Sequence, residues 1–190
     1  MLSICILTQV SDIIKLNLQK DVIIINWIVQ ILGVLGTVLS LILFHKKNMK
    51  NILKVKLLID MVWGIHYLLL GATAAVVSNG VCVFREIVFL NQNKKFFSGN
   101  WWLLVFVLLN WILISITNRS VYSFLPAITS TLATYSFWQK NPQRARVIGI
   151  TNNILMFIYD IFVLSYAGMV NESLALISTT SALIINKKEK

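Results

Sequence analysis

The chain has 190 residues, of which 57% are apolar and 13% charged, and its mean hydropathy is +0.78. Soluble domains carry about 45–50% apolar and about 25% charged residues, so these values exclude an ordinary soluble globule and a disordered chain. The formal net charge of +10 indicates cytoplasmic loops of a membrane protein rather than a nucleic-acid partner, because no basic stripe with interleaved aromatic residues lies outside the apolar runs.

The apolar residues occur in long runs without period-two alternation, which favours membrane helices over a β-barrel. A membrane-spanning helix needs about 20 residues. We therefore predict an all-α membrane protein with seven transmembrane helices, at residues 22–44, 52–71, 72–91, 101–117, 121–138, 147–167 and 170–185.

The two ends of the chain fall outside these helices. Residues 1–21 are predicted to form an N-terminal extension; a cleaved signal peptide is the alternative, although a basic n-region and a small-residue cleavage site are missing. Residues 187–190 form a basic tail. Paired tryptophans, Trp101 and Trp102, open the fourth helix at an interfacial aromatic belt.

The distribution of positive charge predicts the orientation. If the N-terminus is outside, every Lys and Arg except Lys15, Lys20, Arg85 and Arg119 falls on the cytoplasmic side. This is the bias of the positive-inside rule, and only an odd number of helices produces it. We expect a multi-pass protein of the bacterial inner membrane with its C-terminus in the cytoplasm.

An internal repeat follows from shifting the chain along itself. A shift of 94 residues places helix 22–44 on helix 121–138, and with one residue removed His66 meets Tyr159 and Asn79 meets Glu172. Many transporters contain such repeats. We predict two parallel three-helix repeats, residues 22–91 and 121–186, joined by a linker helix within 92–120 (3+1+3).

Three segments carry a family resemblance: GVLGTVLSLILF, GIHYLLLGA with the following VFREIVF, and LPAITSTLATYSFW. They resemble the YgjV-type bacterial inner-membrane proteins over residues 27–185. That family is similar to the SWEET, PQ-loop and nicotinamide riboside transporters, which implies the same 3+1+3 plan. The chain departs from the PQ-loop proteins because its fifth helix has Pro126-Ala127 where they have a Pro-Gln pair.

Ionisable groups within membrane helices cost about 2.5–3.5 kcal/mol each, so they face the bundle interior or a cavity. The residues predicted to bind a substrate are Trp63, His66, Asn79 and Asp160. The residues predicted to form a gate or ion pairs are Asp60, Arg85, Glu86 and Glu172. A purely structural role is the alternative for each of them, because polar stripes also hold helices together.

Their spacing makes further predictions. Lys56 and Asp60 are four residues apart and are expected to pair near the cytoplasmic end. Arg85 and Glu86 point about 100° apart on a helix, so we expect no pair between them. Arg85 then either extends to the interface, bridges to another helix or forms an inner gate. Glu172 is placed at the start of its helix, near the outer surface.

Hinges are predicted at Gly33, Gly36 and Pro126, which lie in the first helices of the two repeats. Glycines permit bending or close approach, and a proline inside a helix removes a hydrogen bond and kinks it. We expect hydroxyls following Pro126 to satisfy the freed carbonyls. Ordinary membrane helices also contain Pro and Gly, which is the alternative.

The sequence lacks several motifs of catalytic, metal and nucleotide sites: there is no CxxC, no His pair at i,i+4, no P-loop and no G-x-S-x-G. We expect no enzyme, no cofactor and no metal, and we expect Cys82 simply to pack. The predicted function is facilitated transport of a small polar metabolite, with the lipid bilayer, the solute and a second copy of the chain as partners. The alternative is a non-transporting membrane binding or scaffold protein on the same bundle.

Overall fold

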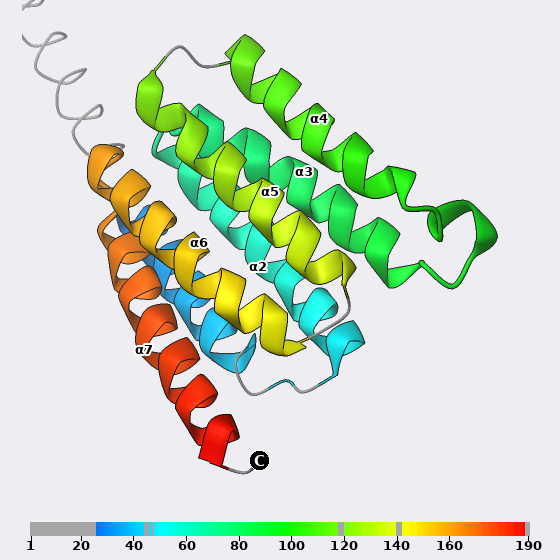
Figure 1. Ribbon diagram of the computed structural model, residues 1–190. Helices are drawn as coiled ribbons and strands as arrows, with labels where there is room; N and C mark the ends of the chain where they lie inside the picture. The colour runs from blue at the N-terminus through cyan, green and yellow to red at the C-terminus, as the bar shows by residue number, and fades with distance from the viewer. Residues whose placement is uncertain (1–25, 44–45, 47, 118–119, 140–141, 189–190) are drawn as a thin grey trace, which may run out of the picture.

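A computed structural model describes residues 26–43, 46, 48–117, 120–139 and 142–188 (Figure 1). Within these ranges every regular element is helical, which confirms the all-α fold class. The helices are Asn26–Leu43, α2 (Met49–Leu69), α3 (Thr73–Leu90), α4 (Trp101–Thr117), α5 (Phe124–Trp138), α6 (Pro142–Phe162) and α7 (Tyr166–Lys188), with short 3-10 turns η1 (Lys95–Phe97) and η2 (Val121–Ser123). The predicted N-terminal extension, residues 1–21, lies outside the described residues, as do Arg119 and the last two residues of the basic tail.

The helices form one bundle in which α4 is peripheral. In Figure 1 the first helix and α2 lie behind α5 and α6, and α4 lies at the edge, where it packs on α3 and α5. Asn110 fastens α4 to both neighbours: its Oδ1 accepts from Ser78 Oγ at 3.0 Å, and its Nδ2 donates to the Ala127 carbonyl at 3.2 Å. A buried amide that is satisfied on both sides fixes the position of an otherwise apolar helix.

The glycines of the first helix allow close approach. A Cβ atom on Gly36 would lie 2.8 Å from Cε2 of Trp63 in α2, and a Cβ on Gly33 would overlap Cβ of Ala167 in α7. These glycines therefore let the first helix pack directly against α2 and α7, which is the close-approach alternative of the sequence analysis.

The two tight joins of the bundle have the same geometry. Gly71 (φ 69°) follows α2 and Leu164 (φ 55°) follows α6. At each turn a backbone N–H reaches a carbonyl five residues back: Ala72 to Tyr67 at 2.9 Å, and Ser165 to Asp160 at 2.9 Å. This is the Schellman ending of a helix, with a left-handed residue one position before the donor.

The boundary between α6 and α7 differs from the prediction. The sixth helix ends at Phe162 rather than residue 167, and α7 begins at Tyr166 rather than residue 170. Ser165 starts the new helix, because its Oγ accepts from the Gly168 N–H at 3.2 Å. Glu172 consequently lies about 6 Å deeper in the bundle than predicted, at about 1.5 Å per residue, and its predicted position near the outer surface is wrong.

Pro126 lies closer to the start of its helix than predicted. Pro126 lies in the first turn of α5, directly after η2. A proline is tolerated in the first turn of a helix, so this position does not by itself require a kink. The hydroxyls that follow bond to local carbonyls instead, Thr129 to Pro126 at 3.0 Å and Thr131 to Ala127 at 2.8 Å.

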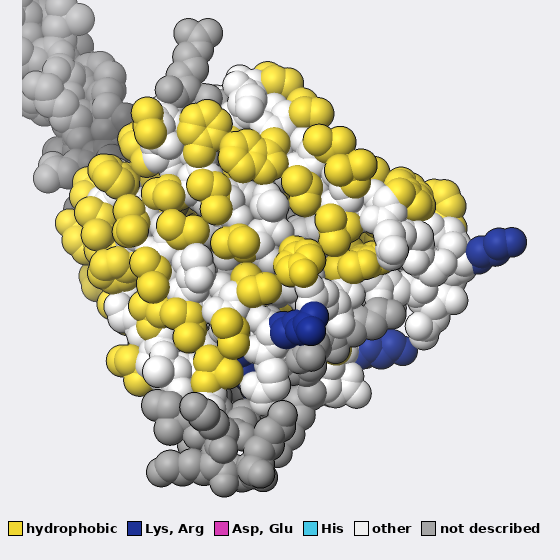
Figure 2. All heavy atoms as spheres, in the orientation of Figure 1, with side chains coloured by type: hydrophobic (Ala, Val, Ile, Leu, Met, Phe, Trp, Pro, Cys, Tyr) yellow, Lys and Arg dark blue, Asp and Glu magenta, His cyan; other side chains and the backbone are white. Residues whose placement is uncertain are grey.

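The surface is apolar and the charged groups inside it are buried. Figure 2 shows hydrophobic side chains across the visible face, with the visible Lys and Arg side chains gathered at its lower right. Three helices are long and apolar enough to cross a membrane, Asn26–Leu43, Thr73–Leu90 and Gln143–Phe162, and Trp101–Thr117 is a shorter apolar helix. By contrast Arg85, Glu86 and Asp160 are each 0% exposed. An apolar exterior around buried charges suits a lipid solvent.

Candidate functional site

A cavity of about 240 Å³ lies inside the bundle between the first helix, α2, α3, α5, α6 and α7. No residue of α4, which the structure describes throughout, lines it. Its polar lining includes Ser40, Lys56, Asp60, Asn79, Arg85, Asn152, Asn153, Asn171 and Glu172. The cavity extends to Lys46 and Arg146 at the end of the bundle where α2 and α6 begin, which we call the basic end. The opposite end, where α2 and α6 finish, is called the far end.

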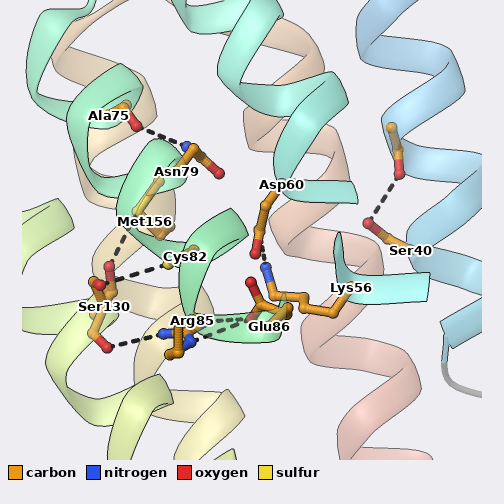
Figure 3. Close-up of polar contacts among 12 residues, drawn as sticks. Ser40, Lys56, Asp60, Ala75, Asn79, Cys82, Arg85, Glu86, Ser130 and Met156 are labelled. Carbon is orange, nitrogen blue, oxygen red and sulfur yellow. Dashed lines mark hydrogen bonds and ion pairs between the residues drawn. The ribbon is translucent and has the colours of Figure 1, made fainter. Parts of the chain in front are cut away.

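Four charged side chains from α2 and α3 lie together beside this cavity. Lys56 pairs with Asp60 one turn along α2, as its spacing predicts. The Arg85 guanidinium pairs with Glu86, with Nη2 at 2.6 Å and Nε at 3.2 Å from Oε1. Figure 3 shows the Lys56 ammonium between the carboxylates of Asp60 and Glu86, so opposite charges alternate along the cluster.

The Arg85–Glu86 pair corrects the expectation that adjacent residues cannot meet. Their Cβ atoms do diverge by about 100°. The arginine side chain is long enough to fold back across that angle, because four torsions separate its guanidinium from the backbone. Both side chains are fully buried, where an unpaired charge would be far more costly than the bent side chain.

Arg85 also connects α3 to α5. Its Nη1 donates to the Ser130 carbonyl at 3.2 Å and to Thr134 Oγ1 at 3.0 Å, and its guanidinium lies 5.4 Å from the centre of the Phe137 ring. This is the helix-bridging alternative of the sequence analysis. Snorkelling to the interface is wrong, because no part of this side chain reaches the surface.

The wall of the cavity contains a thiol. Cys82 lies one turn before Arg85 on α3, and its Sγ is 3.5 Å from Ser130 Oγ (Figure 3). Asn79, one turn earlier still, donates to the Ala75 carbonyl at 2.8 Å, and its amide oxygen points away from that bond toward α2 in Figure 3. The three residues present a thiol, an amide oxygen and a guanidinium along one face of α3.

A second buried cluster closes the far end. His66 of α2 donates from Nδ1 to the Val29 carbonyl of the first helix at 3.0 Å, and in this neutral tautomer its Nε2 accepts from Ser165 Oγ at 3.0 Å. Tyr67 donates to Asp160 Oδ1 of α6 at 2.7 Å. These bonds connect the first helix, α2, α6 and the start of α7, and together they form what we call the far-end cluster.

Aromatic rings fill the space between the far-end cluster and the cavity. The Trp63 ring meets His66 edge-on with centroids 4.9 Å apart, and Tyr67 meets Tyr159 in the same manner at 6.1 Å. Trp63 and Tyr67 also line the cavity. The cavity therefore ends on a layer of rings toward the far end.

The structure separates the predicted site residues into two groups. Trp63 and Asn79 line the cavity, whereas His66 and Asp160 belong to the far-end cluster. Among the predicted gate and ion-pair residues, the cavity lining includes Asp60, Arg85 and Glu172.

Sequence reasoning missed Tyr67, Tyr159 and Ser165 as functional candidates. Tyr67 and Tyr159 adjoin His66 and Asp160, so each is next to a polar residue that had been identified. Ser165 was missed because it lies in a continuous apolar stretch, 163–170, and only its position as an N-cap could have indicated it.

Comparison with the curated proteins and with the solved structures finds no match to this chain. A family model does match: Imp-YgjV, described as a bacterial inner membrane protein, over residues 27–190. This range contains all the helices described above except the first residue of the first helix, together with the cavity and the far-end cluster. The chain belongs to the Imp-YgjV family of bacterial inner membrane proteins.

Proposed function

We propose that the chain crosses the inner membrane several times, with its N-terminus outside and its C-terminus in the cytoplasm, and facilitates the passage of a small polar metabolite through the central cavity. The orientation rests on exposed basic residues at one end of the bundle, among them Lys50, Lys94 and Lys95. The positive-inside rule assigns that end to the cytoplasm.

The observation that carries the proposal is the unsatisfied polar lining of the cavity. Three buried acceptor oxygens of cavity-lining residues have no hydrogen-bond partner among the described residues: Asp60 Oδ2, Asn152 Oδ1 and Asn171 Oδ1. A buried polar atom without a partner costs about 1–3 kcal/mol. Such atoms are retained where something else binds them, and in an open cavity that is water or a solute.

The far-end cluster supplies the gate in this proposal. Its hydrogen bonds hold the first helix, α2, α6 and α7 together beyond the cavity, while the cavity itself extends to the basic end. This arrangement corresponds to a state open toward the cytoplasm. Separation of the cluster, with closure at the basic end, gives the opposite state of alternating access. The matched turns at Gly71 and Leu164 support two parallel repeats that move against each other.

The transport proposal can be tested with a cysteine that the chain already contains. The chain contains only two cysteines, Cys5 and Cys82, and Cys82 lines the cavity. In a Cys5→Ser variant, a membrane-impermeant methanethiosulfonate is applied to inverted vesicles and, separately, to right-side-out vesicles. We expect modification of Cys82 from the cytoplasmic side. We further expect His66→Ala, which removes two far-end bonds, to raise modification from the outer side.

Two single-cysteine controls establish sidedness, each in a chain without Cys5 and Cys82. Lys95→Cys, at the basic end, reports the cytoplasmic face, and Val121→Cys, which is 86% exposed at the far end, reports the outer face. If these controls keep their sidedness in the His66→Ala background, the bundle has not simply unfolded. A non-transporting scaffold predicts no change in the outer modification of Cys82, and that result would overturn the transport proposal.

A further inference from the structure

Glu172 differs from the other acidic residue of the cavity lining. Asp60 also lines the cavity but pairs with Lys56. Among the described residues no Lys, Arg or His side chain forms an ion pair with Glu172. Its carboxyl group therefore lines the cavity without direct contact to a basic side chain of the described residues.

The Glu172 carboxylate is nonetheless held in a fixed position. Asn171 Nδ2 donates to its Oε1 at 3.0 Å. With the amide nitrogen of Asn153 turned toward the acceptors that surround it, this side chain donates to Oε2 at 3.2 Å and to the Gly149 carbonyl at 3.1 Å. One amide from α6 and one from α7 thus orient the two carboxylate oxygens. A carboxyl group that is oriented by neutral donors is not committed to a cation of the protein and remains available to a cationic ligand.

A second acceptor lies beside it. Asn171 is 6% exposed, and its Oδ1 has no hydrogen-bond partner in the part of the chain that the structure describes. The orientation of this amide is not arbitrary, because its nitrogen is fixed by the bond to Glu172 and the reversed amide would place oxygen against carboxylate. The oxygen is therefore an acceptor, and Asn171 also lines the cavity.

We propose that the α6–α7 wall of the cavity, formed by Glu172 with Asn171 and Asn153, binds the ammonium group of a small organic amine. An ammonium group has three N–H donors and no acceptor, which complements a carboxylate next to an unpartnered carbonyl oxygen. This assignment rests on the proposed function, since it names the class of solute that the cavity accepts.

The rest of the cavity favours an organic body over a bare metal ion. Its volume of about 240 Å³ is far larger than an ion needs and lies just below the range of about 300 Å³ and above that is usual for small-molecule sites. The side chains of Trp63, Tyr67 and Met156 line it as well. Aromatic and thioether groups pack well against carbon, and a ring face also attracts a cation.

The test uses matched pairs of ligands on the purified full chain in phosphate buffer, which contains no amine. Ethanolamine, putrescine and glucosamine are each compared with the isosteric alcohol, namely ethylene glycol, 1,4-butanediol and glucose. Thermal unfolding reports binding, because a ligand that binds only the folded state raises the melting temperature. We expect at least one amine to raise it with no shift from its alcohol, and sodium chloride to give no comparable shift.

Substitutions of Glu172 then test whether this side chain binds the amine. Glu172→Gln keeps the shape and removes the charge, and we expect it to weaken amine binding about tenfold or more, which corresponds to at least about 1.4 kcal/mol. Glu172→Asp keeps the charge and should retain the preference for amine over alcohol. Thr180→Ala, at an exposed position of α7, should bind as the unsubstituted chain does.

The outcomes separate this inference from the proposed function. Equal shifts from an amine and its alcohol, or undiminished amine binding by Glu172→Gln, would overturn the ammonium site. Binding of glucose in preference to glucosamine would also overturn it, while leaving the transport proposal intact. The comparison of ligands on the unsubstituted chain needs no variant, so a Glu172→Gln protein that fails to fold does not prevent the test.

Discussion

Tyr67 of α2 donates a 2.7 Å hydrogen bond to Asp160 of α6, and the two residues are 93 positions apart. The same spacing aligns Asn79 with Glu172, which line one cavity, and Gly71 with Leu164, which close equivalent turns. The bond therefore joins corresponding positions of the two predicted three-helix repeats. Two parallel repeats related by an axis along the membrane normal would place such a contact close to that axis.

Removal of the Tyr67 hydroxyl tests the importance of this contact. In Tyr67→Phe the buried Asp160 side chain loses the hydroxyl that donates to its Oδ1, and we expect the free energy of unfolding in detergent to fall by about 1–3 kcal/mol. Tyr135→Phe makes the same chemical change at a side chain that is 51% exposed and should cost much less. Similar losses in the two variants would show that the buried bond contributes nothing particular to stability.

The Arg85–Glu86 pair predicts strong non-additivity. Arg85→Met or Glu86→Gln alone breaks a fully buried pair and leaves the remaining group without that partner, so a loss of about 3–5 kcal/mol is expected for each. The double variant Arg85→Met/Glu86→Gln removes both charges and should lose clearly less than the sum of the two. Denaturant titration of all four proteins gives the coupling free energy. If the double variant loses as much stability as the two single variants together, the pair is not coupled in the folded bundle.

Gly36 is predicted to tolerate no side chain. A methyl group there would lie 2.8 Å from Cε2 of Trp63, and overpacking of this kind costs about 1–3 kcal/mol. Gly80→Ala is the matched control, because nothing lies within 4 Å of its added Cβ, and it should be neutral or slightly stabilising. The melting temperatures of the two variants measure this difference. A Gly36→Ala protein as stable as Gly80→Ala would show that the first helix shifts freely against α2.

Ser165 is predicted to stabilise α7 as its N-cap. Ser165→Ala removes the acceptor for the Gly168 N–H and the partner of His66 Nε2, and loss of a cap costs about 0.5–2 kcal/mol. Ser173, whose Oγ donates to the Met169 carbonyl at 2.8 Å within the same helix, caps nothing. We expect Ser173→Ala to be close to neutral in the same unfolding assay; if it were the more harmful substitution, the capping role of Ser165 would be refuted.

Prediction from sequence succeeded where composition changes abruptly. The α4 helix has the predicted bounds, because paired tryptophans open it and a polar segment follows it. The join between α6 and α7 has no such change, since residues 163–170 are almost entirely apolar, and its position depends on a single serine hydroxyl. Hydropathy reports the solvent around a segment and carries no information about a turn within it.

The residues of the candidate site were likewise predictable in part. The cost of placing charge in lipid was sufficient to indicate that Asp60, His66 and Asp160 face the interior. Whether a residue that faces the interior lines the cavity or closes its end depends on its depth in the bundle and on the helix that it contacts. The sequence of a single helix gives neither. The contact between Arg85 and Glu86 was missed because side-chain direction at Cβ was considered without the length of the arginine side chain.

The two Schellman turns have a consequence for how the bundle is made. Each join between paired helices consists of three residues, 70–72 and 163–165, none of which is charged. If the chain crosses the membrane as proposed, little polar material has to be moved across the bilayer with such a pair, and the adjoining helices can insert together as a hairpin. We therefore expect substitution of Gly71, whose φ of 69° disfavours a side chain, to lower the yield of inserted protein as well as the stability of the folded bundle.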